Sequence, residues 1–200
     1  MSTGETERAE SQIRQHAKLA LRNQMRAVRE ALPKSACEAR SAEITRRLLT
    51  LEEIERASTI LAFAPIRNEV RTRTCMEALW AAGKRVALPR VVGDELKLQL
   101  VGSTTELVEG AFTVPEPPEE APQVKPREVD FALVPALAVD PRGYRVGYGG
   151  GYYDKLIPQL ENACTCVVAY DFQLISEVPE LPLDVAVDLV VTDERVIRAE

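Results

Sequence analysis

Residues 145–155, with the sequence RVGYGGGYYDK, combine four glycines with three tyrosines and carry charged residues at both ends. Glycine tolerates positive φ angles and has no Cβ atom, so such a segment can turn its backbone N–H groups toward a bound anion. The spacing matches neither the Walker phosphate-binding loop nor the complete dinucleotide-binding fingerprint. By composition alone, the glycine loop (residues 147–151) is either a phosphate cradle or a flexible turn.

The side chains beside the glycine loop favour phosphate binding. Cations can bind phosphate oxygens, and tyrosine rings offer flat faces to a planar ligand. Asp154 stands at the expected start of a helix, where it could cap the helix or hold Mg²⁺ between phosphates, since magnesium takes oxygens from only one or two carboxylates. The cations are Arg142, Arg145 and Lys155, and the tyrosines are Tyr148, Tyr152 and Tyr153.

The histidine and cysteine content argues against several other kinds of site. His16 is the only histidine, which disfavours a Ser-His pair and a multi-histidine metal centre. The four cysteines include no Cys-x-x-Cys pair, and Cys164 and Cys166 would share one face of a strand, so neither a zinc site nor a disulfide framework is predicted. Catalysis must therefore use lysine, arginine and oxygen ligands.

The charge balance limits the partners. The chain has 25 basic and 31 acidic side chains, and a net charge of -6 has the wrong sign for binding nucleic acid. An anionic ligand must therefore meet a local basic patch. The amino terminus is polar and no run of about 18 apolar residues occurs, so we expect a cytoplasmic protein without a signal peptide or a membrane span.

Alternating strands and helices must position these residues. We expect one domain over residues 1–200, with 1–12 as a flexible tail, and a mainly parallel α/β sheet covered by helices on both faces. Ligands of such folds bind beyond the carboxyl ends of the strands. The expected helices are 13–32, 35–50, 74–84 and 152–160, and the expected strands are 58–65, 85–91, 96–101, 129–137, 164–170 and 185–191.

Three local features support this division. Ser35 and Glu38 have the spacing of a capping box, and Gly83 is expected to end the helix before it. The acidic, proline-rich segment 114–128 is predicted to be a surface loop. The strand 129–137 should lead straight into the glycine loop.

The first helix carries cations beside its apolar stripe. Its apolar residues recur in steps of three and four, and the cations Lys18, Arg22, Arg26 and Arg29 fall at the edge of that stripe. These cations either line a ligand site or form a solvated basic face.

Residues 134–157, VPALAVDPRGYRVGYGGGYYDKLI, closely resemble the signature segment of the 5-formyltetrahydrofolate cyclo-ligase family, whose members are also called 5,10-methenyltetrahydrofolate synthetases. The resemblance extends to nearly the whole chain, and the segment 114–128 and the first dozen residues are its weakest parts. It implies a three-layer sandwich of the NagB/RpiA/CoA-transferase type. Further matching segments are KLALR (18–22), NEVRT (68–72), GKRVALPRV (83–91) and DLVVTDE (188–194).

The resemblance implies an ATP- and Mg²⁺-dependent closure of a reduced folate ring. In that family ATP phosphorylates the formyl oxygen of 5-formyltetrahydrofolate, N10 attacks the activated carbon, and phosphate leaves. Such an enzyme needs phosphate cradling, charge neutralisation and close placement of two reactants, none of which requires histidine. We accordingly expect a monomer that binds a small-molecule folate, with or without a polyglutamate tail, and neither nucleic acid nor membrane.

The resemblance also assigns roles to individual residues. Lys18, Arg145 and Tyr153 would be catalytic, and Glu69 and Tyr152 would bind the folate. Asp154 would bind the metal. The ATP-binding residues would be Lys18, Arg22, Arg145, Gly147, Tyr148, Gly149, Gly150, Gly151 and Tyr153.

The second metal ligand is less well defined. The family shows a His-Asp pair before the last strand, whereas this chain has Leu183 and Asp184. Asp184 matches by its distance from the closing segment, and Asp188 is the alternative. Two other functions stay open: a folate- or nucleotide-binding protein without turnover, and a sugar-phosphate isomerase of related architecture.

Overall fold

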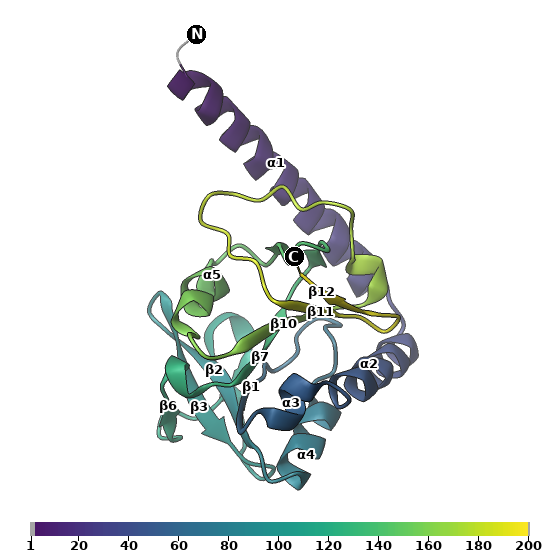
Figure 1. Ribbon diagram of the computed structural model, residues 1–200, viewed down its shortest axis with the longest axis vertical. Helices are drawn as coiled ribbons and strands as arrows, with labels where there is room; N and C mark the ends of the chain where they lie inside the picture. Colours follow the sequence, from purple (N-terminus) through teal and green to yellow (C-terminus); the bar gives the residue numbers. More distant parts are fainter. Residues whose placement is uncertain (1–2, 200) are drawn as a thin grey trace.

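A sheet of eight strands runs through the centre of the molecule (Figure 1). The computed structural model describes residues 3–199. The strand order is β12-β11-β10-β7-β1-β2-β3-β6; neighbours from β11 to β2 pair in parallel, and β12 and β3 are antiparallel to theirs. The strands are β1 (Thr59–Leu61), β2 (Arg85–Val92), β3 (Glu95–Val101), β6 (Gln123–Val124), β7 (Phe131–Pro135), β10 (Cys164–Val168), β11 (Leu189–Val191) and β12 (Val196–Arg198).

Helices cover both faces of this sheet, as predicted. On one face lie α2 (Lys34–Leu48), α3 (Glu52–Arg56) and α4 (Arg73–Ala81), and on the other lies α5 (Tyr152–Leu156) with the 3₁₀ turn that follows it. In β1, Ile60 packs into the first of these two cores and neighbouring Leu61 into the second. A central strand buried on both faces is continuously apolar for this reason.

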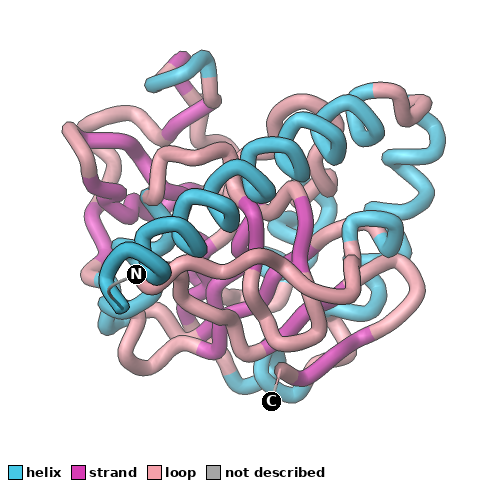
Figure 2. The backbone as a smooth tube through the Cα atoms, turned by 90° about the horizontal axis from the view of Figure 1, so that it is seen from above, coloured by secondary structure: helices cyan, strands magenta, loops and turns pink. Residues whose placement is uncertain are grey.

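The long helix α1 (Thr3–Glu30) crosses the molecule over the strands, as Figure 2 shows. Its carboxyl-terminal part packs through Met25 against Leu137, Ala138 and Val146, while its amino-terminal part projects beyond the body (Figure 1). No helix within residues 3–199 is long and apolar enough to cross a membrane.

Two short hairpins complete the structure. β4 (Val108–Glu109) pairs with β5 (Pro115–Glu116), and β8 (Ala138–Val139) pairs with β9 (Arg145–Val146). The 3₁₀ turns, including the one that follows α5, are Ala111–Thr113, Pro126–Glu128, Ile157–Gln159 and Asp171–Gln173.

The structure corrects two expectations about helix ends. α1 begins at Thr3, so the predicted tail is helical from there, because residues 8–15 are mostly strong helix formers. Residues 1 and 2 lie outside the described part. The predicted capping box of Ser35 and Glu38 is wrong, since α2 starts after Pro33, whose side chain makes no capping hydrogen bond. The expected C-cap is confirmed: Gly83 has a φ of +75° just after α4.

The structure also corrects expectations about strands. The segment 114–128 is only partly a loop, because β5 and β6 lie within it and β6 forms an edge of the main sheet. The strand β12 was not predicted, since its exposed edge position gives no apolar run. The strand predicted at 185–191 is regular only from Leu189. All four cysteines are free, as expected.

Candidate active site

The glycine loop directly follows the hairpin of β8 and β9, which the sequence analysis did not predict. Its two strands lie between β7 and the loop, where the Leu137 N–H donates to the Val146 carbonyl at 2.7 Å. The turn closes around the fully buried carboxylate of Asp140, which accepts the backbone N–H groups of Tyr144 and Val178. The loop therefore starts from a backbone that is fixed on both sides.

Two glycines of the loop need their special conformations. Gly149 and Gly151 have φ angles of +106° and +69°, and Gly151 forms the amino-terminal cap of α5. A Cβ atom on Gly149 would lie 3.4 Å from the Cζ atom of Arg22, and one on Gly150 would lie 2.8 Å from the Tyr152 ring. A Cβ atom on Gly147 would have no neighbouring atom within 4 Å.

Two predicted cations of α1 contact predicted site residues, Arg22 at the glycine loop and Lys18 at Asp184. The Arg22 Nε donates to the carbonyl of Gly147 at 2.8 Å, and the Lys18 Nζ donates to the carboxylate of Asp184. Lys18 is buried although it lies on a helix that is mostly exposed before it. Lys18 is therefore buried against Asp184 and Arg22 is partly buried against the loop, so the solvated-face interpretation is wrong for these two residues.

Arg145 joins the two predicted metal-binding segments. Its Nη2 donates to the Asp154 carboxylate at 2.9 Å, and its Nη1 donates to the carbonyl of Val185 at 2.6 Å, next to Asp184. Burial lowers the pKa of the Arg145 guanidinium, and the carboxylate of Asp154 opposes this shift most strongly, with smaller contributions from Tyr153 and Asp184. Two carboxylates thus flank one buried cation.

The two candidates for the second carboxylate differ in their contacts. Asp188 accepts both the N–H and the hydroxyl of Thr165, at 2.7 and 2.6 Å, which uses it to tie β11 to β10. Asp184 accepts the Leu181 N–H at 2.6 Å and faces Lys18. The geometry favours Asp184 for ligand contact and gives Asp188 a structural use.

Glu69 lies in the connection between β1 and α4, where Arg67 and Asn68 have positive φ angles. Its carboxylate is buried, accepts the Ile66 N–H at 3.0 Å and lies 3.6 Å from the guanidinium of Arg29. Burial raises the pKa of Glu69, and Arg29 is the main opposing influence. The Glu69 carboxylate is therefore buried and fixed by a hydrogen bond, and it is not a solvent-exposed charge on a loop.

Tyr148 brings the glycine loop to Glu69. The Arg29 guanidinium donates to the Tyr148 hydroxyl, and both Arg29 and Arg67 lie over the Tyr148 ring, at 5.5 and 5.9 Å from its centroid. Tyr148 was predicted at the phosphates, whereas its ring lies at the Glu69 end of the site. Its role in ATP binding stays a prediction.

The two tyrosines of α5 differ in their surroundings. Tyr153 packs against the core beneath α5, and burial raises its pKa. Tyr152 meets the ring of Phe112 edge-on with 6.4 Å between centroids. Phe112, which sequence reasoning did not single out, is 75% exposed with a φ of +57°, and its one visible signal was an aromatic residue within a polar segment.

Comparison with known proteins decides the family. The family model described as 5-formyltetrahydrofolate cyclo-ligase family matches residues 14–193. The 5-formyltetrahydrofolate cyclo-ligase of Escherichia coli K12 is 32% identical over 157 residues, covering 75% of this chain and 86% of the relative. The chain belongs to the 5-formyltetrahydrofolate cyclo-ligase family.

Other members of the cyclo-ligase family agree with this assignment. The 5-formyltetrahydrofolate cyclo-ligase of Mycolicibacterium smegmatis is 34% identical over 148 residues, covering 70% of this chain and 76% of the relative. The solved structure of Aquifex aeolicus 5,10-methenyltetrahydrofolate synthetase has a TM-score of 0.80 and 34% identity, and covers 90% of this chain and 92% of that one. The expected α/β three-layer fold is thereby confirmed.

Two cations beside the cyclo-ligase glycine loop do not face the site. Arg142 binds Asp140 and Glu180, and Lys155 binds Asp94 on the turn after β2.

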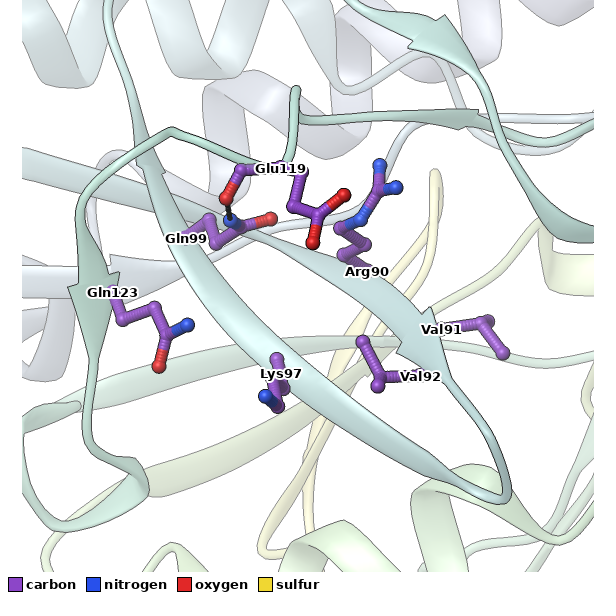
Figure 3. A pocket seen from close by; sticks show the side chains of 7 residues that line it. All are labelled: Arg90, Val91, Val92, Lys97, Gln99, Glu119 and Gln123. Atoms are coloured by element: carbon purple, nitrogen blue, oxygen red, sulfur yellow. Dashed lines mark hydrogen bonds between the residues drawn. The ribbon is translucent and has the colours of Figure 1, made fainter.

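A separate pocket of about 270 Å³ on β2, β3 and β6, shown in Figure 3, has none of the predicted site residues in its lining. The side chains of Arg90, Lys97, Gln99 and Glu119 there have mixed charge.

Proposed function

We propose that this cyclo-ligase uses Mg-ATP to convert 5-formyltetrahydrofolate into 5,10-methenyltetrahydrofolate, with ADP and phosphate as the other products. The observation that supports this best is the meeting of three distant segments: cations of α1, the glycine loop, and the buried Glu69 joined to that loop through Arg29 and Tyr148. Such a site can hold a triphosphate beside a planar ring that carries N–H donors.

The reaction has a clear chemical requirement. The formyl oxygen is amide-like and does not leave until it is phosphorylated. We infer that the formyl oxygen attacks the γ-phosphorus, that the bond to the bridging oxygen of ADP breaks, and that N10 then attacks the activated carbon. Loss of the N10 proton and of phosphate gives the methenyl cation. The protein must place the reactants in line and offset the charge on the phosphates.

The basic residues of α1 and β9 supply that charge. Lys18 and Arg22 lie one turn apart on α1, so both can point at the same phosphate chain. Arg145 is already desolvated by burial, which strengthens its attraction for an anion that enters. The backbone of residues 147–151 would complete the cradle, since the glycines leave its N–H groups accessible.

The residues present fit a bound magnesium ion. Within residues 3–199 no group of three or more metal-binding side chains is found, and Mg²⁺ between phosphates needs only one or two carboxylates. Asp154 and Asp184 would hold it. Each carboxylate would then bind the metal instead of its present partner, which is Arg145 for Asp154 and Lys18 for Asp184. When bound, the ion would offset charge on the phosphate oxygens.

In this proposal the folate ring would bind at Glu69. An ionised carboxylate can accept two N–H donors from the edge of a pterin, which an apolar wall cannot do. Tyr152 and the adjoining Phe112 offer aromatic surface on the other side of the glycine loop. Tyr153 stays protonated because burial raises its pKa, so it could act as a hydrogen-bond donor.

A turnover assay tests the proposal. The protein is mixed with 5-formyltetrahydrofolate and Mg-ATP, and the methenyl chromophore is followed in the near ultraviolet. We expect absorbance to grow with one ADP released per product, and neither to occur without ATP. Folate binding without turnover would support the non-catalytic alternative. Isomerisation of a sugar phosphate without any folate reaction would support the isomerase alternative.

A further inference from the structure

Arg29 is a buried cation at the end of α1 that no predicted role explains. The side chain is only 1% exposed, and its Nη1 donates to the Ala136 carbonyl at 3.2 Å. Its Nη2 donates to the Tyr148 hydroxyl and faces the Glu69 carboxylate at 3.6 Å. Its Nε has no hydrogen-bond partner within residues 3–199. Burying a guanidinium here costs desolvation energy, so we looked for a function that would require a cation at this position.

The contacts of Arg29 connect parts of the site that differ in function. Ala136 follows β7, Tyr148 belongs to the glycine loop, and Glu69 follows β1. The backbone of α1 is held at the same place, since the Asn68 amide donates to the Arg29 carbonyl at 3.3 Å and to the Leu32 carbonyl at 3.0 Å. Arg29 is thus the meeting point of α1, the Glu69 loop and the glycine loop.

Few groups can stabilise an ionised Glu69. Arg67 and Arg71 belong to its own loop, Arg29 comes from α1, and the Ile66 N–H donates to one carboxylate oxygen. The charged or titratable groups on the other elements packed nearby are Tyr148 of the glycine loop, Tyr153 of α5 and Tyr170 after β10, whose hydroxyl donates to the Glu69 carbonyl at 3.1 Å. Tyrosines stay neutral near pH 7 and supply no positive charge. Arg29 therefore has the largest opposing effect on a carboxylate that burial would otherwise protonate.

We propose that Arg29 is a positioning residue of the folate site, which keeps the Glu69 carboxylate ionised and aimed at the N–H edge of the bicyclic ring and fixes Tyr148 beside it. This inference rests on the proposed function for the identity of the ring. An ionised carboxylate accepts donors with both oxygens, whereas a protonated one presents a competing donor. Arg29 would thereby couple α1, which also binds the phosphates, to recognition of the folate.

The test is the pH dependence of the KM for 5-formyltetrahydrofolate in Arg29→Met. Without the guanidinium, the pKa of Glu69 should rise, so that the protonated and weakly binding form is populated near pH 7. The KM should rise about tenfold for each unit by which that pKa exceeds the assay pH, and should fall again toward about pH 9. In the wild type the KM should be flat over the same range, and the KM for ATP should change far less.

Three further variants separate positioning from structural support. Arg29→Lys keeps the charge and should restore the flat profile, while Glu69→Gln should raise the KM equally at every pH. The double variant Arg29→Met/Glu69→Gln should show the same pH-independent KM profile as Glu69→Gln. Arg56→Met serves as the surface control, because Arg56 pairs with Glu52 on the exposed side of α3. A KM that rises by one factor at all pH values in Arg29→Met would overturn the inference.

A measurement on the unmodified protein keeps the inference testable if Arg29→Met does not fold. Glutamate labelled with ¹³C at the carboxyl carbon reports ionisation, and the Glu69 signal is identified as the one missing from Glu69→Gln. We expect an ionised Glu69 at neutral pH. A protonated Glu69 there would refute the role of Arg29. This titration needs no turnover, so it is separable from failure of the proposed function, which would show as absence of the methenyl product in the wild type.

Discussion

At the scale of single residues, the candidate site contains two ion pairs that a charged ligand could exchange with. Lys18 pairs with Asp184, and Arg145 pairs with Asp154. A triphosphate could take the place of each carboxylate beside its cation, and magnesium could take the place of each cation beside its carboxylate. Ligand binding then need not leave a buried charge unpaired. This arrangement explains why cations and carboxylates are interleaved here rather than separated.

Asp154→Ala should reduce kcat at least about a hundredfold while changing folate affinity little, because the lost carboxylate is the one that we propose to hold the metal at the phosphates. Steady-state kinetics and folate titration by fluorescence measure the two effects. Asp154→Asn is the isosteric companion. Full activity of Asp154→Ala at saturating Mg²⁺ would contradict the metal role.

Asp184→Asn and Asp188→Asn should separate activity from stability. Asp188 bonds Thr165 within the sheet, so Asp188→Asn should lower the free energy of unfolding by about 1–3 kcal/mol with little change in kcat. Asp184→Asn should lower kcat by about tenfold or more, since Asp184 pairs with Lys18, which we propose to bind the phosphates. Urea unfolding and turnover are measured on both; the reverse pattern would assign the metal to Asp188.

At the scale of elements, α1 and the glycine loop form one functional unit. The helix brings Arg22 to the loop, and the two pack closely because Gly149 has no side chain to separate its backbone from Arg22. The sequence predicted the apolar stripe and the cations beside it, since both follow from helical periodicity. It could not predict Arg29 as a buried residue, because burial depends on Ala136, Tyr148 and Glu69, which are distant in sequence.

Arg22→Ala should mainly raise the KM for ATP, by about 10- to 100-fold, with a smaller effect on the KM for folate. The guanidinium bonds the Gly147 carbonyl, so the variant loses a charge and a loop contact together. Initial rates at varied ATP and fixed folate give the result. An unchanged ATP dependence would mean that the helix only supports the loop.

Gly149→Ala should destabilise the protein by about 1–3 kcal/mol, because an alanine at a φ of +106° is strained. Gly147→Ala is the matched comparison and should lose little stability, since nothing lies within 4 Å of the Cβ position there. Thermal and urea unfolding distinguish the two. Equal losses would show that positive φ at residue 149 is not required.

At the scale of the whole molecule, the parallel strands and the helices on both faces were predictable, and the edges were not. The central strands are continuous apolar runs, which indicates burial on both faces. β6 and β12 contain only two and three residues, lie at edges and have no such pattern. The hairpin of β8 and β9 was hidden because Asp140 organises it through long-range bonds, such as the one from the Val178 N–H.

The burial of Glu69 should also appear in the stability of the whole protein. Its pKa is raised from 4.5 on folding, mainly by burial, so the folded state binds more protons and its stability falls as pH rises above that value. Glu69→Gln removes this titration. The free energy of unfolding of Glu69→Gln relative to the wild type should therefore grow as pH increases from about 4.5. A difference that stays constant with pH would contradict the shift.

The position of α1 has a consequence for biosynthesis. Lys18, Arg22 and Arg29 leave the ribosome early, whereas Asp184, Gly147 and Tyr148 follow more than a hundred residues later. Until then Lys18 lacks the carboxylate that it pairs with in the folded protein, and a ribosome-bound fragment ending before the glycine loop lacks the proposed nucleotide site. We therefore expect nucleotide binding to arise only after the segment that contains Asp184 has been translated and has packed against α1.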